Sequence, residues 1–262
     1  MIDYHMHSYL CRHGQGEIAQ YVEAALSKGL REIGFAEHIP IPDLDDPTGR
    51  MIIEDWDTYV HDVQAAQKNY PEITIRFGIE ADYLPGHMDF IERFLSDYLF
   101  DYVIGSVHFV GDWDFSNPAL AARLEKIGIN ELYRRYYDLI GRAASSGLYD
   151  IIGHLDLPKK IGVAPTIDTF PYEESALLAI QKNDLALDIN TSGLRKGAGD
   201  TYPGTALIKR AFEKNIAVCL GSDAHEPDEV AADFEKTVEK LKSVGYRQSC
   251  RFNQRRRYFW DL

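Results

Sequence analysis

The segment AVCLGSDAH, residues 217–225, decides the fold, because a short apolar run ends directly in an aspartate and a histidine. The same arrangement recurs along the chain, where short runs rich in β-branched and aromatic residues lead into polar side chains. These runs start near Ile2, Glu32, Ile73, Tyr102, Asp150 and Leu185. Most are followed by a stretch with the 3.6-residue apolar period of a helix. Alternating strands and helices predict a parallel sheet.

Helical periodicity is clear in four stretches, at residues 18–30, from Trp56 to Gln67, from Leu132 to Ala143, and after Pro227. In the last of these, we expect the inward-facing side chains to be Val230, Phe234, Val238 and Leu241. Gly29, Gly147 and Gly245 stand where such helices should end.

Seven strand–helix units in 262 residues predict one α/β domain over residues 1–262, folded as a seven-stranded TIM-like (β/α)7 barrel. An open doubly wound sheet is the alternative. The polar residues favour the barrel, because they follow every predicted strand. A barrel gathers all its strand ends at one mouth, whereas an open sheet uses one switch point.

The polar side chains at these strand ends are mostly histidines and include seven of the nine in the chain. They are His5, His7, His13, His38, Glu80, His108, His154, Asn190, Arg195, Asp223 and His225. One histidine at a strand end is usually structural, but this recurrence indicates a metal site. Imidazole and carboxylate ligands without an obvious thiolate fit Zn, Mn or Fe.

The remaining candidates have ordinary structural interpretations. Cys11 lies near His13 and could ligate, but a buried apolar role is the more common one for such a cysteine. His61 and His87 are expected at the surface. The cluster Arg255–Arg257 is expected to be a surface or packing feature rather than an RNA site.

A net charge of −13 argues against nucleic acid as a partner, since nucleic-acid binding needs a basic surface. An anionic substrate is compatible with this charge only if bound cations dominate the local field. There is no apolar run long enough for a membrane span and no signal-peptide pattern, and the three cysteines are scattered. We therefore expect a cytoplasmic protein without a membrane partner. No feature of the sequence indicates its oligomeric state.

The motifs together resemble the polymerase-and-histidinol-phosphatase (PHP) superfamily, in order from residue 3 to about residue 226. They are His5-x-His7, His13, Glu37-His38, GIEADY, SVH, GHLD and SDAH. The length, the CRHG stretch and the INTSGLRKG segment are most similar to the stand-alone histidinol-phosphate phosphatases. The resemblance implies a distorted seven-stranded barrel, two to three divalent metal ions, and hydrolysis of L-histidinol phosphate in histidine biosynthesis.

The resemblance also implies the ligand sets. One ion should be held by His5, His7, Glu80 and Asp223. A second ion should be held by Glu80, His108 and His154, with Glu80 bridging the two ions. A third ion should be held by His13, His38 and His225. Glu80, Asp223 and His225 are accordingly the predicted catalytic residues.

The expected chemistry follows from the metals. Adjacent divalent ions lower the pKa of a bridging water, so we expect a metal-bridging hydroxide to attack phosphorus. Arg195 and Lys160 are the predicted phosphate contacts of a small phosphomonoester substrate, with Lys159 as an alternative. The proton donor to the leaving group is left open between a metal-bound water and Asp156. The competing functions are a PHP-type phosphodiesterase or exonuclease, and a non-catalytic metal-binding module.

Overall fold

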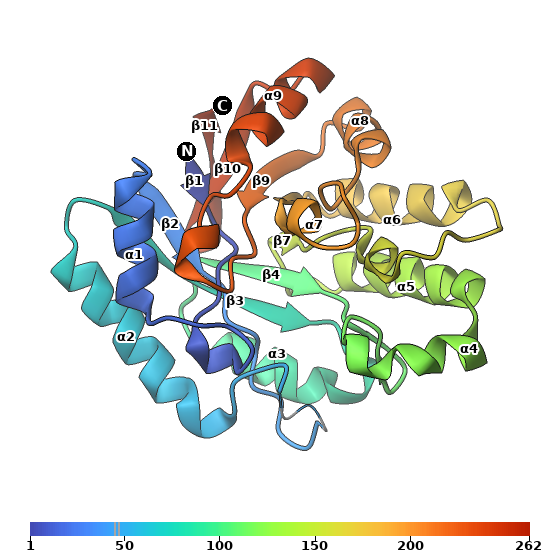
Figure 1. Ribbon diagram of the computed structural model, residues 1–262, viewed down its shortest axis with the longest axis horizontal. Coiled ribbons are helices and arrows are strands. Elements are labelled where there is room, and N and C mark those ends of the chain that lie inside the picture. Colours follow the sequence, from blue (N-terminus) through green and yellow to red (C-terminus); the bar gives the residue numbers. More distant parts are fainter. Residues whose placement is uncertain (45, 47) are drawn as a thin grey trace.

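Seven strands form one parallel sheet in a computed structural model that describes residues 1–44, 46 and 48–262 (Figure 1). Neighbours along the chain are neighbours in the sheet, in the order β1-β2-β3-β4-β7-β8-β9. The strands are β1 (Ile2–Asp3), β2 (Glu32–Phe35), β3 (Thr74–Asp82), β4 (Tyr102–Ser106), β7 (Ile151–Ile152), β8 (Ala186–Asn190) and β9 (Ala217–Gly221). Each begins within one residue of the position predicted from the sequence.

The first and last strands also run side by side. The Tyr4 amide donates to the Leu220 carbonyl at 3.1 Å, and the His7 amide donates to the Ala224 carbonyl at 2.9 Å. These contacts close the sheet into the predicted seven-stranded α/β barrel and exclude the open doubly wound alternative. The barrel is distorted, since β1 and β7 are regular over only two residues each.

Helices surround the barrel and bury their apolar faces against it (Figure 1). They are α1 (Ile18–Ser27), α2 (Trp56–Asn69), α3 (Met88–Asp97), α4 (Leu124–Ile127), α5 (Ile129–Ala144), α6 (Phe170–Lys182), α7 (Ser192–Arg195), α8 (Thr205–Glu213) and α9 (Phe234–Val244). In the described part of the chain, no helix is both long and apolar enough to cross a membrane.

The helix expected directly after Pro227 begins later than predicted. Pro227–Glu229 forms a 3₁₀ turn, and α9 starts at Phe234. Ala231 and Asp233, between them, have φ angles of 51° and 60°. This left-handed backbone cannot continue a right-handed helix, so the two segments stay separate. Val230, Phe234 and Leu241 are nevertheless buried, as the apolar pattern predicts.

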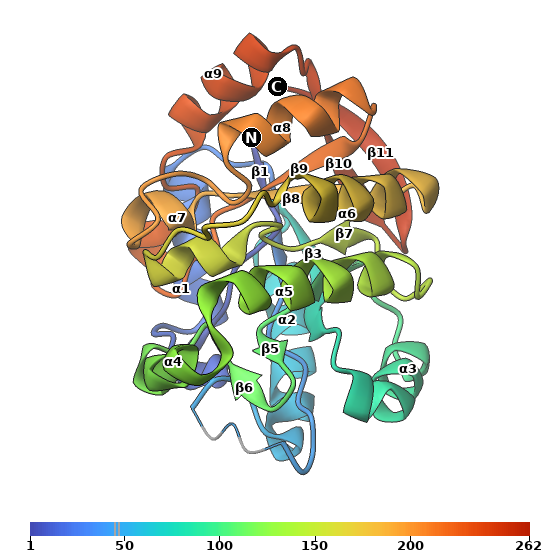
Figure 2. The same cartoon turned by 90° about the vertical axis from the view of Figure 1, so that its right-hand side faces the viewer.

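The C-terminal segment forms a hairpin that the sequence did not lead us to expect. It consists of β10 (Gln248–Asn253) and β11 (Arg256–Asp261), paired antiparallel. Cys250 and Phe252 of β10 are buried in one cluster with Tyr4 and Cys219 from the barrel strands. The Phe252 amide also donates to the Tyr4 hydroxyl at 3.0 Å. The hairpin thereby covers the end of the barrel at which the strands begin, and Figure 2 shows it on the side opposite α7.

Arginines of the hairpin hold it in place. Arg255 forms an ion pair with Asp150 and Arg257 with Asp184, and these carboxylates lie just before β7 and β8. Two of the three clustered arginines therefore serve packing, as expected.

A second unexpected hairpin follows β4 beside the barrel mouth. It pairs β5 (Phe109–Val110) with β6 (Trp113–Asp114) and leads into a 3₁₀ helix at Pro118–Arg123. This segment forms part of the wall around the site described next.

Candidate metal centre

The nine predicted metal ligands converge at the barrel mouth, where the strands end. Eight of them lie at or just after a strand. His5 and His7 follow β1, His38 follows β2, Glu80 is in β3, His108 follows β4, His154 follows β7, and Asp223 and His225 follow β9. The ninth, His13, comes from the loop after the 3₁₀ turn Tyr9–Cys11.

Glu80 lies at the centre of the cluster, and its two carboxylate oxygens face different histidines. Oε2 is 2.8 Å from His38 Nδ1, 3.4 Å from His5 Nε2 and 3.5 Å from His7 Nε2. Oε1 is 3.1 Å from His154 Nε2 and 3.7 Å from His108 Nε2. A carboxylate placed in this way can bridge two cations.

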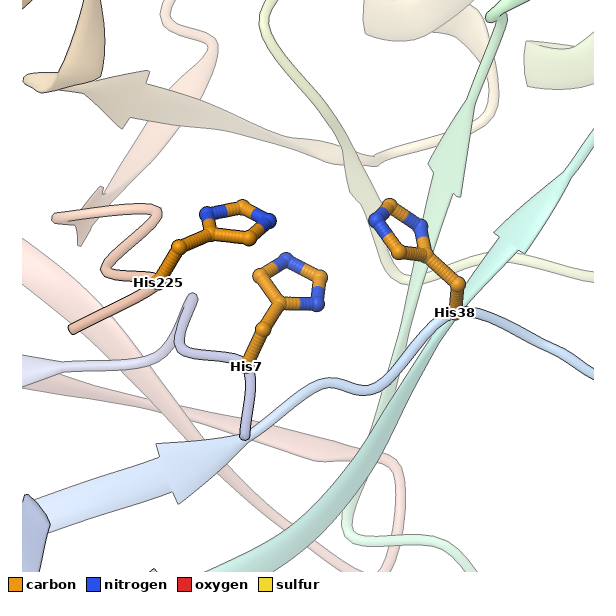
Figure 3. Close-up of side chains that lie close together, drawn as sticks. All are labelled: His7, His38 and His225. Atoms are coloured by element: carbon orange, nitrogen blue, oxygen red, sulfur yellow. The ribbon is translucent and has the colours of Figure 1, made fainter. Parts of the chain in front are cut away.

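Asp223 and the remaining histidines form the other side of the cluster. Asp223 Oδ1 lies 3.4 Å from His7 Nε2. Figure 3 shows the His7 ring between those of His38 and His225, with centroids 4.3 Å and 4.4 Å away. The His13 ring lies 4.5 Å from that of His225.

The donor atoms fit divalent metal ions. Among the described residues, buried His5 Nε2, His7 Nε2 and His225 Nε2 have no hydrogen-bond partner. Glu80 Oε2 and His38 Nδ1 lie 2.8 Å apart, but their geometry is not that of a hydrogen bond. His108 Nε2 and His154 Nε2 face each other at 3.2 Å. Burying so many polar atoms without partners is costly. Cations coordinated by nitrogen and carboxylate oxygen would satisfy them, and Zn, Mn and Fe prefer such ligands.

Carboxylates behind the ligands orient the rings. His5 Nδ1 is bound to Asp188 at 2.8 Å, and His108 Nδ1 to Asp82 at 2.9 Å. Arg50 holds Asp82 in turn, at 3.1 Å. Bonding at Nδ1 leaves Nε2 directed at the metal site.

The sequence reasoning missed both of these carboxylates, although a signal was present. Asp82 is two residues from Glu80 in β3, and Asp188 is two residues from Asn190 in β8. Residues separated by two share one face of a strand, so both face the barrel interior.

Burial and neighbouring charges set the protonation of four of these groups. Burial lowers the pKa of His13, His38 and His225, which keeps these rings in the neutral form that binds metal. Burial alone would raise the pKa of Glu80, but His5, His38 and His108 outweigh it and hold that pKa well below its usual range. The Glu80 carboxylate is therefore ionised.

A cavity of about 260 Å³ opens beside this cluster. Its wall includes Asp114, Lys160, Ser192, Lys196 and Tyr202, in addition to several of the metal ligands. Burial and the nearby Lys196 lower the pKa of Lys160, whose ammonium donates to the Ser116 carbonyl at 2.8 Å. No carboxylate within the described ranges forms an ion pair with Lys196. The cavity therefore joins a metal centre to two cationic side chains.

Arg195, a predicted phosphate contact, is bound to other groups of the protein in this structure. Its Nε donates to Glu229 at 3.0 Å and its Nη2 to the Ser222 carbonyl at 2.8 Å, and the side chain does not line the cavity. Glu229 also accepts from the His225 amide at 2.9 Å. Arg195 thus supports the loop that carries a metal ligand. Lys196, which the sequence reasoning did not select, lines the cavity instead.

Two further candidates, Asp156 and Lys159, do not line the cavity. Asp156 accepts from Lys159 Nζ and from the Gly204 amide, both at 2.9 Å, and neither side chain is part of the cavity wall. This placement does not support Asp156 as the proton donor or Lys159 as the alternative phosphate contact.

Cys11, His61 and His87 were expected to have structural or surface roles, and the structure agrees for some of them only. Cys11 is buried, and its sulfur lies close enough to His13 and His225 to share a metal with them. Its thiol donates to the Ser8 carbonyl at 3.1 Å, and burial raises its pKa. His61 is exposed as expected, whereas His87 is half-buried.

The comparisons with known proteins agree with this geometry. The sequence profile of the PHP domain matches residues 3–192. A protein of Deinococcus radiodurans named "Probable histidinol-phosphatase" is 43% identical, over 94% of this chain and 95% of its own length. The histidinol-phosphatase of Bacillus subtilis is 34% identical, over 91% of this chain and 98% of its own length.

A solved structure shares the fold. It is the histidinol phosphate phosphatase of Lactococcus lactis, determined with Zn, L-histidinol and phosphate, and it matches with a TM-score of 0.84. The two chains are 22% identical, and the match covers 98% of each. By its PHP domain and by its identity to full-length relatives, the chain belongs to the histidinol-phosphatases of the PHP family.

Proposed function

We propose that the protein hydrolyses L-histidinol phosphate to L-histidinol and phosphate, as a step of histidine biosynthesis. The observation that carries the proposal is the convergence of Glu80 and eight other histidine and carboxylate side chains, beside a cavity with two lysines. The name of the Bacillus subtilis relative supports the substrate.

The site is proposed to hold two to three divalent ions of Zn, Mn or Fe. The first ligand set consists of His5, His7, Glu80 and Asp223. The second consists of Glu80, His108 and His154, and the third of His13, His38 and His225. When bound, such ions supply hydroxide at neutral pH and neutralise charge on the phosphoryl oxygens. Glu80, which belongs to both of the first two sets, would hold them together.

The protein's own cations and carboxylates position the substrate. Lys196 and Lys160 are proposed to bind phosphoryl oxygens through charge-assisted hydrogen bonds. Asp114 is buried in the cavity wall and forms no ion pair with a described residue, so its carboxylate is suited to the amino group of histidinol. Positive and negative groups in one small cavity favour a zwitterionic monoester over a long polyanion.

The test is turnover of histidinol phosphate, p-nitrophenyl phosphate and a dinucleotide diester by protein loaded with Zn or Mn. We expect histidinol phosphate to have the highest kcat/KM, and we expect chelation to abolish activity. A preference for the diester would overturn the substrate assignment while leaving a metallophosphoesterase. Activity that survives complete removal of metal would overturn the metal-dependent mechanism.

A further inference from the structure

Tyr202 is a buried tyrosine whose hydroxyl group has no protein partner. The side chain is 1% exposed and lines the cavity, yet its hydroxyl forms no hydrogen bond with any residue that the structure describes. The two serine hydroxyls of the cavity wall are already engaged. Ser192 Oγ donates to Asn190 and lies 2.9 Å from Asp223, and Ser116 Oγ donates to Asp114. An unpaired buried hydroxyl is destabilising, which points to a ligand that satisfies it.

The tyrosine is held rigidly. Its backbone pairs with Asn190 in both directions, at 2.7 Å and 2.9 Å. One face of the ring lies against Gly193, where an added Cβ would come within 2.9 Å of it, and the Lys159 ammonium is 4.9 Å from the ring centroid. A phenol fixed in this way loses little conformational entropy when it donates a hydrogen bond.

The position of Tyr202 selects the part of the substrate that it would contact. Asn190, to which it is paired, donates to the metal ligand Asp223 at 3.3 Å. Ser192 and Lys196, which follow Asn190 in the chain, line the same cavity as Tyr202. The group bound next to the metal ligands in a phosphatase is the phosphoryl group, whose oxygens accept hydrogen bonds. Burial raises the pKa of Tyr202, so the phenol remains a donor at neutral pH.

We propose that Tyr202 binds the substrate directly, by donating a hydrogen bond from its hydroxyl to a phosphoryl oxygen beside Lys196. This inference rests on the proposed phosphatase function and adds a neutral donor to the two lysines. Because nothing else in the described structure uses the hydroxyl, its removal should weaken phosphate binding without weakening the fold.

The experiment compares Tyr202→Phe with wild-type enzyme, both loaded with the same metal and checked for equal metal content. We expect the inhibition constant for inorganic phosphate to rise, and kcat/KM for histidinol phosphate to fall, by about 10-fold or more. The Tm should equal or exceed that of wild type, because an unsatisfied polar group is removed. Tyr246→Phe is the matched control. Its buried hydroxyl donates to the Ile216 carbonyl at 3.0 Å, so that variant should lose stability and keep phosphate binding.

Two results would overturn the proposal. One is an unchanged inhibition constant for phosphate together with unchanged kcat/KM, which would mean that water or nothing satisfies the hydroxyl. The other is a clear fall in Tm for Tyr202→Phe, which would reveal a structural partner. The proposed substrate and the proposed role of Tyr202 can be refuted independently. If wild type hydrolyses p-nitrophenyl phosphate but not histidinol phosphate, the proposed substrate is wrong, while inhibition by phosphate still tests Tyr202.

Discussion

His5 and Asp188 form a buried pair in which imidazole Nδ1 lies 2.8 Å from carboxylate Oδ2. Neither side chain is more than 2% exposed. The pair fixes the ring so that Nε2 points toward Glu80 Oε2, 3.4 Å away. Asp188 also accepts from Asn190 at 3.0 Å, so one carboxylate orients a metal ligand and a neighbouring amide.

Asp188→Asn should therefore weaken metal binding at the His5 site. Outer carboxylates of this kind typically contribute about 10- to 100-fold to metal affinity or activity. Metal titration and steady-state kinetics measure the loss. Asp184→Asn, which alters an exposed carboxylate just before the same strand, is the control and should leave both quantities unchanged. Equal effects of the two substitutions would refute an orienting role for Asp188.

Glu80→Gln should abolish turnover and lower the metal content. The amide keeps the shape of the side chain but removes the negative charge that faces five histidines. Elemental analysis of the purified variant, alongside kcat, tests this. A near-normal kcat with full metal content would show that Glu80 is not a bridging ligand.

Lys196→Ala and Arg195→Ala should behave differently, although the residues are adjacent. Loss of a charge-assisted contact to phosphate costs about 1.5–3 kcal/mol, so Lys196→Ala should lower kcat/KM roughly 10- to 150-fold with metal content intact. Arg195→Ala removes the ion pair with Glu229, which holds the His225 amide, and should act mainly by lowering metal occupancy. Kinetics and metal analysis of both variants distinguish the two cases. Reversed behaviour would place Arg195, not Lys196, on the phosphate.

Metal affinity should rise with pH. In the metal-free protein, burial lowers the pKa of His108, but Asp82 and Glu80 outweigh burial and raise it to about 9. Metal binds only the deprotonated ring, so binding releases this proton below pH 9. The apparent Mn affinity of the ligand set that contains His108 should increase about tenfold per pH unit between pH 7 and 9 and then level off. Calorimetry in buffers of different ionisation enthalpy measures the proton release, and a binding heat that does not depend on the buffer would contradict it.

Phe252→Ala should destabilise the barrel without altering its chemistry. Phe252 is 2% exposed and packs into the cluster at the covered end of the barrel. Truncating a buried phenylalanine typically costs about 3–5 kcal/mol. Denaturant unfolding should show this loss, while kcat per folded molecule stays at the wild-type value. A large change in kcat at full folding would show that the hairpin affects the distant site.

The barrel and its ligand positions were predictable from sequence because both depend on local pattern. Each apolar run ends in a polar group, and the parallel geometry gathers those ends. The choice between Arg195 and Lys196 was not predictable. Arg195 is the last residue of the single helical turn α7, and Lys196 follows it with an extended backbone, so the two side chains leave the chain in different directions. Only the structure shows which of the two faces the cavity.

The C-terminal hairpin was missed for a different reason. In β10 the buried residues are Ser249, Cys250 and Phe252, with the half-buried Arg251 between them, and the arginine-rich β11 is mostly exposed. So short a buried segment does not stand out beside charged neighbours. The partners that make the hairpin stable, Tyr4 and Asp150, are distant in sequence.

The pairing of the first strand with the last has a consequence during protein synthesis. His5 and Asp223 belong to one predicted ligand set, yet about 220 residues separate them along the chain. At about 5–20 residues per second, a ribosome needs roughly 10–45 s to cover that distance. For that interval the edge of β1 that will face β9 has no partner strand. His5 and His7, which follow β1, meanwhile lack Asp223. The metal centre therefore forms after β9 has left the ribosome, and a nascent chain that stalls earlier carries histidines without a finished site.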